Sequence, residues 1–484
     1  MTITWEQVLA FLCEDQTMAI TSLLFLAFFA AVALINYALP RVLRPYFLLA
    51  ASYGFFCYDP VNRPLVWVIA AATVLTWLCG LIIGKVRAKP VRVLALAASV
   101  GFGIGILVYY KYWNLLADTV GGSILSHREN LLAPLGLSYF TFAAMSYTID
   151  VYKRRCRVET NLLHYALFVS FFPTLINGPI ERYPQMRPQI QKSRRFSYGR
   201  CAGGAFRMLW GYTKKMVIAD NLSHYVSLVY GDVGSMSGPN LVAATVLFAV
   251  QLYMDFSGCC DIALGAARIL GYDLIENFQS PFEARTFNDF WRRWHISMTS
   301  WFRDYVYIPL GGSRCRLRRT CLNLLIVFAL TGLWHGAAWQ YVVFGLLHGI
   351  ILCMERLGLR RALEQLPRLF RHLYTVVLLW LTLVIFGAPG LSEGLAVLRG
   401  IFTWQSGAKG YMLAAFADTK LLLILAASFL LCGPVQALCP KLKAALYAKK
   451  APSPAGMAGL LVLLFLGLMR VTAGTYSAFI YFQF

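Results

Sequence analysis

Long apolar segments, each bounded by short polar loops, recur through almost the whole sequence. A run of roughly 20 apolar residues can cross a bilayer as a helix, and only helices and closed barrels satisfy their backbone hydrogen bonds in lipid. We therefore predict an all-α, polytopic integral membrane protein with about eleven transmembrane helices, plus re-entrant and interfacial helices. The predicted spans outside the central region include residues 20–38, 65–84, 93–110, 132–152, 162–176, 240–256, 260–270, 372–386, 421–432 and 457–473.

Composition supports the same class, because 59% of the residues are hydrophobic and only 14% are charged. The formal net charge is +22, but the basic residues lie in short loops and form no basic domain, so we expect no nucleic acid as a partner. The positive-inside rule explains this distribution and predicts that loops 85–92, 153–157 and 314–319 face the cytoplasm. The expected location is the inner (cytoplasmic) cell membrane.

Some segments need a separate interpretation. Residues 1–18 have no basic region typical of a secretory signal, so we predict a retained first helix. Segment 46–58 is shorter than a usual span. If Arg41 before it and Lys85 after the next helix are both cytoplasmic, however, this segment must cross the membrane together with that helix. Segment 206–218 contains Lys214 and Lys215 and is predicted to be interfacial.

Charged residues also occur within apolar segments. Asp255, Asp261 and Arg268 are predicted to form a buried ion-pair cluster with an architectural role. No fixed-period repeat and no long linker is visible, so we predict a single membrane-embedded domain over residues 1–484, with its motif core at about 250–350.

Polar and charged side chains are concentrated in one stretch, residues 281–348. An ionisable residue at membrane depth is costly and usually faces a cavity or a partner, which makes His335 the first candidate for chemistry and His295 the second. We predict that His295 lies on one face of an amphipathic interfacial helix with Trp291 and Phe302, and that Asp289 pairs with the arginines that follow it.

Glycines flank the histidines of the next apolar segment. Gly332 and Gly336 are predicted to leave space for the His335 imidazole and for an approaching group. Gly345 and Gly349 flank His348 in a pattern of small residues that favours close helix packing, so we predict a structural role for His348.

Other catalytic templates are absent. There is no Walker A loop and no H-E-x-x-H motif, and none of the twelve cysteines forms C-x-x-C. We therefore expect no metal site, no disulfide framework and no bound cofactor. A substrate hydroxyl would need a base, and histidine has the unperturbed pKa that suits this at neutral pH.

The run FNDFWRRWHISMTSWFRDYVYIPLGGSR, followed by LTGLWHG, resembles the membrane-bound O-acyltransferase (MBOAT) family, and within it the bacterial alginate and polysaccharide O-acetyltransferase branch. The resemblance covers nearly the whole chain and implies the MBOAT fold. Small departures are Cys259 and Cys260 after DFSG and Ser313 where Asn is common. The other matching runs are YMDFSGCCDIALG, ENF, PLGLSYFTF, YTIDVY, FPTLINGPIERY and the C-terminal YFQF.

The resemblance also implies roles. His335 would deprotonate an acceptor hydroxyl, and His295 would either orient the thioester or help to stabilise the oxyanion. Acetyl-CoA is the expected acyl donor, and Arg316, Arg318 and Arg319 are candidates to attract it, although the positive-inside rule explains the same charges. The expected partners are membrane lipid, a polysaccharide acceptor outside the cell, and a separate extracytoplasmic esterase-like acetyltransferase.

Two alternatives remain open at this point. D-alanyl transfer from a carrier protein to teichoic acid is a related activity, although the run YIPLGGSR favours the polysaccharide-acetylating branch. A transporter or flippase without chemistry could share the same hydropathy and intramembrane charges. Only the acyltransferases would depend on His335 for turnover.

Overall fold

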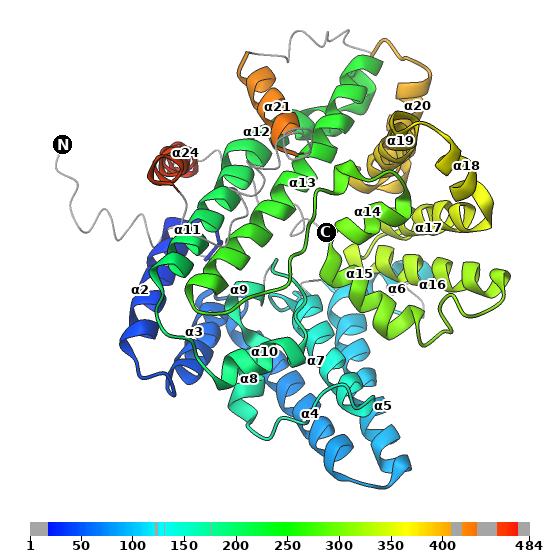
Figure 1. The fold of residues 1–484 in the computed structure, drawn as a ribbon. Coiled ribbons are helices and arrows are strands. Elements are labelled where there is room, and N and C mark those ends of the chain that lie inside the picture. Colours follow the sequence, from blue (N-terminus) through cyan, green and yellow to red (C-terminus); the bar gives the residue numbers. More distant parts are fainter. Residues whose placement is uncertain are drawn as a thin grey trace. The chain divides into compact units, whose positions relative to one another are not determined.

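The structure is a computed structural model that describes residues 18–121, 124–129, 131–175, 177–407, 419–432 and 453–472. Regular structure in these residues is helical, without β-strands, which confirms the all-α prediction (Figure 1). The C-terminal YFQF run and Ile176 lie outside the described residues. Six described helical stretches are long and apolar enough to cross a membrane, namely Arg63–Lys85, Lys89–Val120, Gly238–Ile269, Leu317–His335, Trp339–Gln365 and Arg368–Gly387. The chain is thus a multi-pass membrane protein, while about eleven spans stays a prediction.

The described helices group into two compact units, and α11 and α13 each contribute to both. The single-domain organisation predicted from sequence stays a prediction. Unit 1 comprises residues 1–208, 259–275 and 449–454. Its helices are α2 (Leu23–Ala38), α3 (Arg44–Tyr58), α4 (Val66–Lys85), α5 (Lys89–Leu107), α6 (Trp113–Val120), α7 (Leu137–Tyr152), α8 (Leu162–Ser170), α9 (Phe172–Leu175), α10 (Tyr183–Gln191), most of α11 (Tyr198–Tyr212) and the end of α13 (Gly238–Ile269).

Small residues allow the helices of unit 1 to pack closely. A Cβ atom at Gly80 of α4 would meet the ring of Tyr147 on α7, and one at Gly103 of α5 would meet Met145. Ser99 and Thr148 share a buried hydrogen bond of 2.9 Å between α5 and α7. The predicted span 162–176 is interrupted, since α8 ends at Ser170 and α9 begins at Phe172.

Unit 2 comprises residues 209–258, 276–448 and 455–484. Short 3₁₀ or π segments also occur in the chain, among them η3 (Thr213–Ala219), η6 (Arg303–Tyr307) and η7 (Glu355–Leu359). The described α-helices of this unit, beside the end of α11 and the start of α13, are α12 (Asp220–Gly231), α14 (Phe287–Arg293), α15 (Ile296–Phe302), α16 (Leu317–His335), α17 (Trp339–Met354), α18 (Arg360–Gln365), α19 (Arg368–Gly387), α20 (Leu391–Phe402), α21 (Thr419–Cys432) and α24 (Pro454–Thr472).

α16 and α17 pack so closely that their backbones are in contact. A Cβ atom at Gly345 would collide with the carbonyl oxygen of Phe328 and would lie 3.0 Å from the Cα of Gly332. A Cβ atom at Gly332 or Gly336 would collide with Tyr341. The prediction that Gly332 and Gly336 make room for the His335 imidazole is therefore wrong, because both glycines accommodate α17. Close packing at Gly345 is confirmed.

The two predicted spans 240–256 and 260–270 form one continuous helix, α13, of 32 residues. Glycines on α13 allow α11 to pack closely against it. A Cβ atom at Gly265 would collide with the carbonyl oxygen of Gly204 in unit 1, and a Cβ atom at Gly258 would collide with the carbonyl oxygen of Gly211 in unit 2. Gly258 thus serves helix packing and does not end the helix. This close approach brings basic residues of α11 and the π segment η3 beside α13.

The carboxylates of α13 pair with these basic residues. Lys215 Nζ lies 3.2 Å from Asp255 and 2.7 Å from Asp220 in unit 2. Arg207 lies 2.6 Å from Asp261 in unit 1. Buried ion pairs at Asp255 and Asp261 are confirmed, but the prediction named Arg268 as the basic member and did not name Lys215 or Arg207. Segment 206–218 was predicted to lie at the membrane interface, whereas the Lys215 side chain is only 1% exposed.

Candidate active site

His335 ends α16, where Gly336 continues the chain in an extended conformation. The residue is 4% exposed. The rings of Trp334, Phe344 and Phe386 lie around the imidazole, with centroid distances of 5.4, 6.1 and 5.3 Å. His335 is therefore a buried histidine at the end of a candidate membrane span, enclosed by aromatic side chains.

His295 lies at a break in the backbone. The predicted continuous interfacial helix is wrong here, because α14 ends at Arg293 and α15 begins at Ile296, with His295 between them at φ = +44°. A left-handed conformation is uncommon for a residue with a Cβ and is often found at functional sites. The break turns His295 inward, so that it is 0% exposed. The predicted pairing of Asp289 is confirmed for Arg293, at 2.8 Å.

Asn277 determines which nitrogen of His295 carries the proton. Asn277 Oδ1 accepts hydrogen bonds from the backbone N–H and the hydroxyl of Ser297, at 3.1 and 2.9 Å. Because a backbone N–H can only donate, this atom is the amide oxygen, and the His295 Nδ1 at 3.1 Å must donate to it. In a neutral imidazole Nε2 then has a free lone pair, and among the described residues it has no hydrogen-bond partner.

The two histidines are close enough to interact electrostatically. Both imidazoles contact the ring of Trp334, whose centroid lies 5.4 Å from the centroid of each. Burial, and then the charge of His335, hold the pKa of His295 well below its usual range. His295 is therefore neutral at pH 7. The structure brings together the two histidines that the sequence analysis selected.

His348 has both ring nitrogens satisfied. Trp291 Nε1–H donates to His348 Nδ1 at 3.1 Å, so the proton lies on Nε2, which donates to Thr382 Oγ1 at 2.8 Å. Thr382 donates onward to the carbonyl oxygen of Leu379 at 2.8 Å. This fully buried chain holds the indole of Trp291 in place, in agreement with the structural role predicted for His348.

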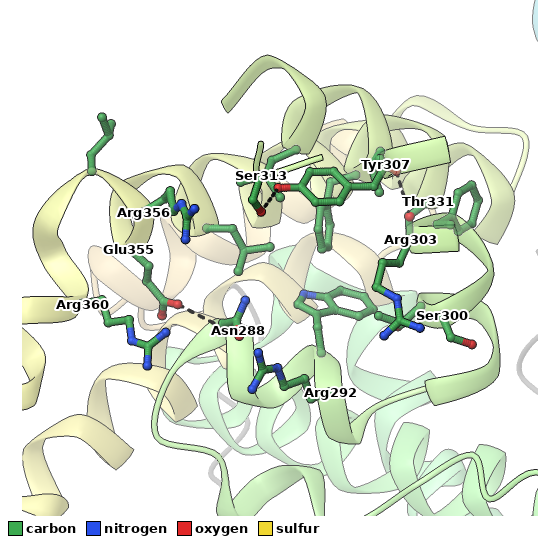
Figure 2. Close-up of a pocket in the computed structure, with 18 of the residues that line it drawn as sticks. Asn288, Arg292, Ser300, Arg303, Tyr307, Ser313, Thr331, Glu355, Arg356 and Arg360 are labelled. Carbon is green, nitrogen blue, oxygen red and sulfur yellow. Dashed lines mark hydrogen bonds between the residues drawn. The ribbon is translucent and has the colours of Figure 1, made fainter. Parts of the chain in front are cut away.

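A cavity of about 940 Å³ lies beside Trp291 (Figure 2). Its wall includes Trp291, Phe328 and Thr331. Trp291 also lines a small void at His335, so this one side chain borders both spaces. Figure 2 shows arginines pointing toward the cavity from several elements; its basic lining residues are Arg292, Arg303, Arg356, Arg360 and Arg361.

Three of these arginines carry uncompensated charge. Arg303 pairs with Asp304 and Arg360 with Glu364, each at 2.9 Å. No ion pair within the described residues involves Arg292, Arg356 or Arg361. A polar opening with such cations is suited to an anionic ligand.

The arginines selected from sequence lie elsewhere. Arg316, Arg318 and Arg319 are exposed at the start of α16 and do not line the cavity, although Leu317 does. Their attraction for an acyl donor stays a prediction. Among the described residues, no three His, Cys, Asp or Glu side chains are placed to hold a metal ion.

Glu355 positions the N-terminus of α14. Its carboxylate accepts the backbone N–H groups of Phe287 at 2.7 Å and Asn288 at 3.1 Å. This contact ties the helix that carries Trp291 to the end of α17. The sequence analysis did not select Glu355 and noted Asn277 only as part of the ENF run. An acidic residue directly after a long apolar segment was the signal that could have found Glu355.

Known proteins share much of this sequence. The family model of MBOAT, the membrane-bound O-acyltransferase family, matches residues 135–392. The chain is 32% identical over 497 residues to the probable alginate O-acetylase AlgI of Pseudomonas putida, which covers 96% of this chain and 100% of that protein. It is 33% identical to the peptidoglycan O-acetyltransferase of Helicobacter pylori, with 78% and 76% of the two chains covered.

Similarity to another activity is more limited. The teichoic acid D-alanyltransferase of Bacillus subtilis is 29% identical over 237 residues, which cover 46% of this chain and 59% of that protein.

Proposed function

The chain belongs to the membrane-bound O-acyltransferase family and is an acyltransferase, and we propose that it moves acetyl groups from cytoplasmic acetyl-CoA across the inner membrane for O-acetylation of an extracellular polysaccharide. Among its relatives are a probable alginate O-acetylase and a peptidoglycan O-acetyltransferase. An extracytoplasmic esterase-like acetyltransferase would complete the transfer to the polymer.

The observation that carries this proposal is the basic cavity whose wall includes Trp291, a side chain that also lines the void at His335. A volume of about 940 Å³ is at the upper end of ordinary ligand pockets and suits an elongated nucleotide thioester. Arg292, Arg356 and Arg361 would bind the phosphates of CoA, and the thioester would extend past Trp291 toward His335.

The reaction uses His335 as a general base. The acceptor hydroxyl transfers its proton to His335 as its oxygen attacks the thioester carbonyl. The tetrahedral intermediate then breaks the carbon–sulfur bond, and the proton passes from His335 to the CoA thiolate. An ester and free CoA result, without any other reactant.

His295 has a more restricted part in this proposal. Its neutral tautomer presents a lone pair at Nε2 and has no N–H to give to an oxyanion. We assign it the role of accepting a hydrogen bond from a substrate donor other than the attacking hydroxyl, whose single proton passes to His335. The oxyanion then requires a different hydrogen-bond donor.

D-alanyl transfer to teichoic acid is the second candidate. Its support is the Bacillus subtilis relative, but that similarity covers less than half of this chain. A transporter without chemistry has no support from the family or from these relatives. We therefore retain acetyl transfer as the primary proposal.

The test uses inside-out membrane vesicles of the producing bacterium, which expose the cytoplasmic face to added radiolabelled acetyl-CoA. The wild type should place base-labile label on polysaccharide, and His335→Ala should lose about 10²- to 10⁴-fold of this activity. Asn36→Ala, a change of a buried polar residue in unit 1, controls for insertion. If His335→Ala is present in the membrane at normal levels and labels polysaccharide as well as the wild type does, His335 is not the base.

A further inference from the structure

The void at His335 is very small. It holds about 10 Å³, room for roughly one water molecule or one methyl group. Bulky apolar side chains line it, among them Trp291, Trp294, Phe344 and Phe386. The base that takes the proton of the attacking hydroxyl therefore faces a space that excludes long acyl chains.

The aromatic part of this wall is held in place from behind. Trp291 donates to His348, and Trp294 stacks on Phe290 with ring centroids 5.5 Å apart. Phe386 packs against Phe344 at 4.9 Å. Because packed aromatic rings cannot move independently, the void cannot expand without displacing several side chains together.

A second, much larger space adjoins the void on another side. A groove of about 910 Å³ between α13 and α19 is lined by aliphatic residues such as Val246 and Val376. Phe282, Leu379 and Leu383 line both the groove and the void. These three side chains therefore form the partition between a space for one methyl group and a space for a long chain.

We infer that the wall around His335 restricts the transferred acyl group to acetyl, and that Phe282, Leu379 and Leu383 determine this selectivity. The inference rests on the proposed function, because the hydroxyl must lie within hydrogen-bond reach of His335 and beside the acyl carbonyl carbon that it attacks. The methyl of an acetyl group fills the void. Each further methylene collides with the partition.

Opening the partition should extend the range of donors. Leu383→Ala joins the void to the groove, so that propionyl and butyryl chains gain a space lined by apolar groups. Phe282→Leu opens the same partition at a half-buried residue and serves if Leu383→Ala does not fold. Val376→Ala is the matched control, since Val376 lines the groove but not the void.

The experiment supplies radiolabelled acetyl-, propionyl- and butyryl-CoA to the same vesicles and compares kcat/KM for each donor. The wild type should prefer acetyl-CoA, and Leu383→Ala or Phe282→Leu should raise the ratio of butyryl to acetyl transfer by about tenfold or more. Val376→Ala should leave the ratio unchanged.

Three results would overturn the inference: equal use of butyryl-CoA and acetyl-CoA by the wild type, an unchanged ratio in partition variants that still transfer acetyl groups, or an equal rise in Val376→Ala. Each of these leaves acetyl transfer intact. Failure of the proposed function looks different, because the wild type would then transfer no label from any of the three donors, and the inference would fall with it.

Discussion

Asn277 Oδ1 accepts the Nδ1 proton of His295 at 3.1 Å, across 18 residues of sequence, and thereby directs the Nε2 lone pair of that histidine away from Asn277. Ser297 holds the same oxygen through its backbone N–H and its hydroxyl. The amide is thus a positioning group whose effect on activity should pass through His295.

Replacement of Asn277 tests this role. Asn277→Leu removes the acceptor, and kcat should fall by about tenfold or more, since a buried hydrogen bond is worth about 1–3 kcal/mol when one partner is deleted. Asn277→Asp keeps the acceptor but adds negative charge beside Nδ1, which should raise the pKa of His295. The acidic limb of its pH–rate profile should move to higher pH than in the wild type.

The wild-type profile provides the reference for this comparison. Because burial and His335 hold the pKa of His295 low, protonation of His295 should not limit the wild type at pH about 6.5, where an exposed imidazole is half protonated. The acidic limb of the wild type should instead report protonation of the general base. An active Asn277→Asp variant with the wild-type profile would argue that His295 does not titrate in the reaction.

Two triple variants distinguish the contribution of the cavity arginines to donor binding from that of the basic run at residues 314–319. Changing Arg292, Arg356 and Arg361 to Gln removes cations that line the cavity, whereas changing Arg316, Arg318 and Arg319 to Gln removes the same charge outside it. The first variant should raise KM for acetyl-CoA by about tenfold or more, since hydrogen bonds to charged groups are worth about 1.5–3 kcal/mol.

The second variant serves as the control for net charge. Its KM should remain near the wild-type value, and the salt dependence of KM should weaken more in the cavity variant. A larger rise of KM in the Arg316, Arg318 and Arg319 variant would instead support the donor role predicted from sequence.

Lys215 is the common partner of Asp220 and Asp255, at 2.7 and 3.2 Å. Lys215→Met leaves these buried carboxylates without this cation and should destabilise the protein by about 3–5 kcal/mol. Adding Asp220→Asn and Asp255→Asn should restore much of the loss, because all three substituted side chains are then neutral. Thermal unfolding in detergent measures both effects; a triple variant less stable than Lys215→Met would contradict the ion-pair explanation.

Glu181 should make stability depend on pH. Burial raises the pKa of Glu181 from 4.5 to about 8, although its hydrogen bond from Ile275 N–H and the charge of Arg182 oppose this. The folded state therefore binds more protons than the unfolded state between these values, so this contribution falls as pH rises through that window, by up to about 1.4 kcal/mol per unit.

Glu181→Gln keeps an oxygen for Ile275 N–H and cannot ionise. Its unfolding temperature relative to the wild type should rise from pH 5 to pH 8. The exposed Glu129→Gln is the control and should show no such trend. A constant difference between Glu181→Gln and the wild type over this range would show that Glu181 is ionised throughout.

The sequence by itself determined the helical membrane class, because long apolar segments have few stable alternatives in lipid. It also selected His295 and His335, since an ionisable side chain within such segments is costly and the surrounding runs match a known family. These conclusions depend on local composition and motif spacing, which do not require knowledge of distant contacts.

Only the tertiary structure decided how these residues act. Periodicity predicted a continuous helix through His295, but hydrogen bonds from His295 and Ser297 to Asn277 support a left-handed break that buries the imidazole. Gly332 and Gly336 accommodate α17, which no local pattern assigned to them. The cavity arginines come from η6, α14 and the region after α17. Such groupings arise from packing between elements distant in sequence, where shape and the pairing of buried polar atoms outweigh local propensity.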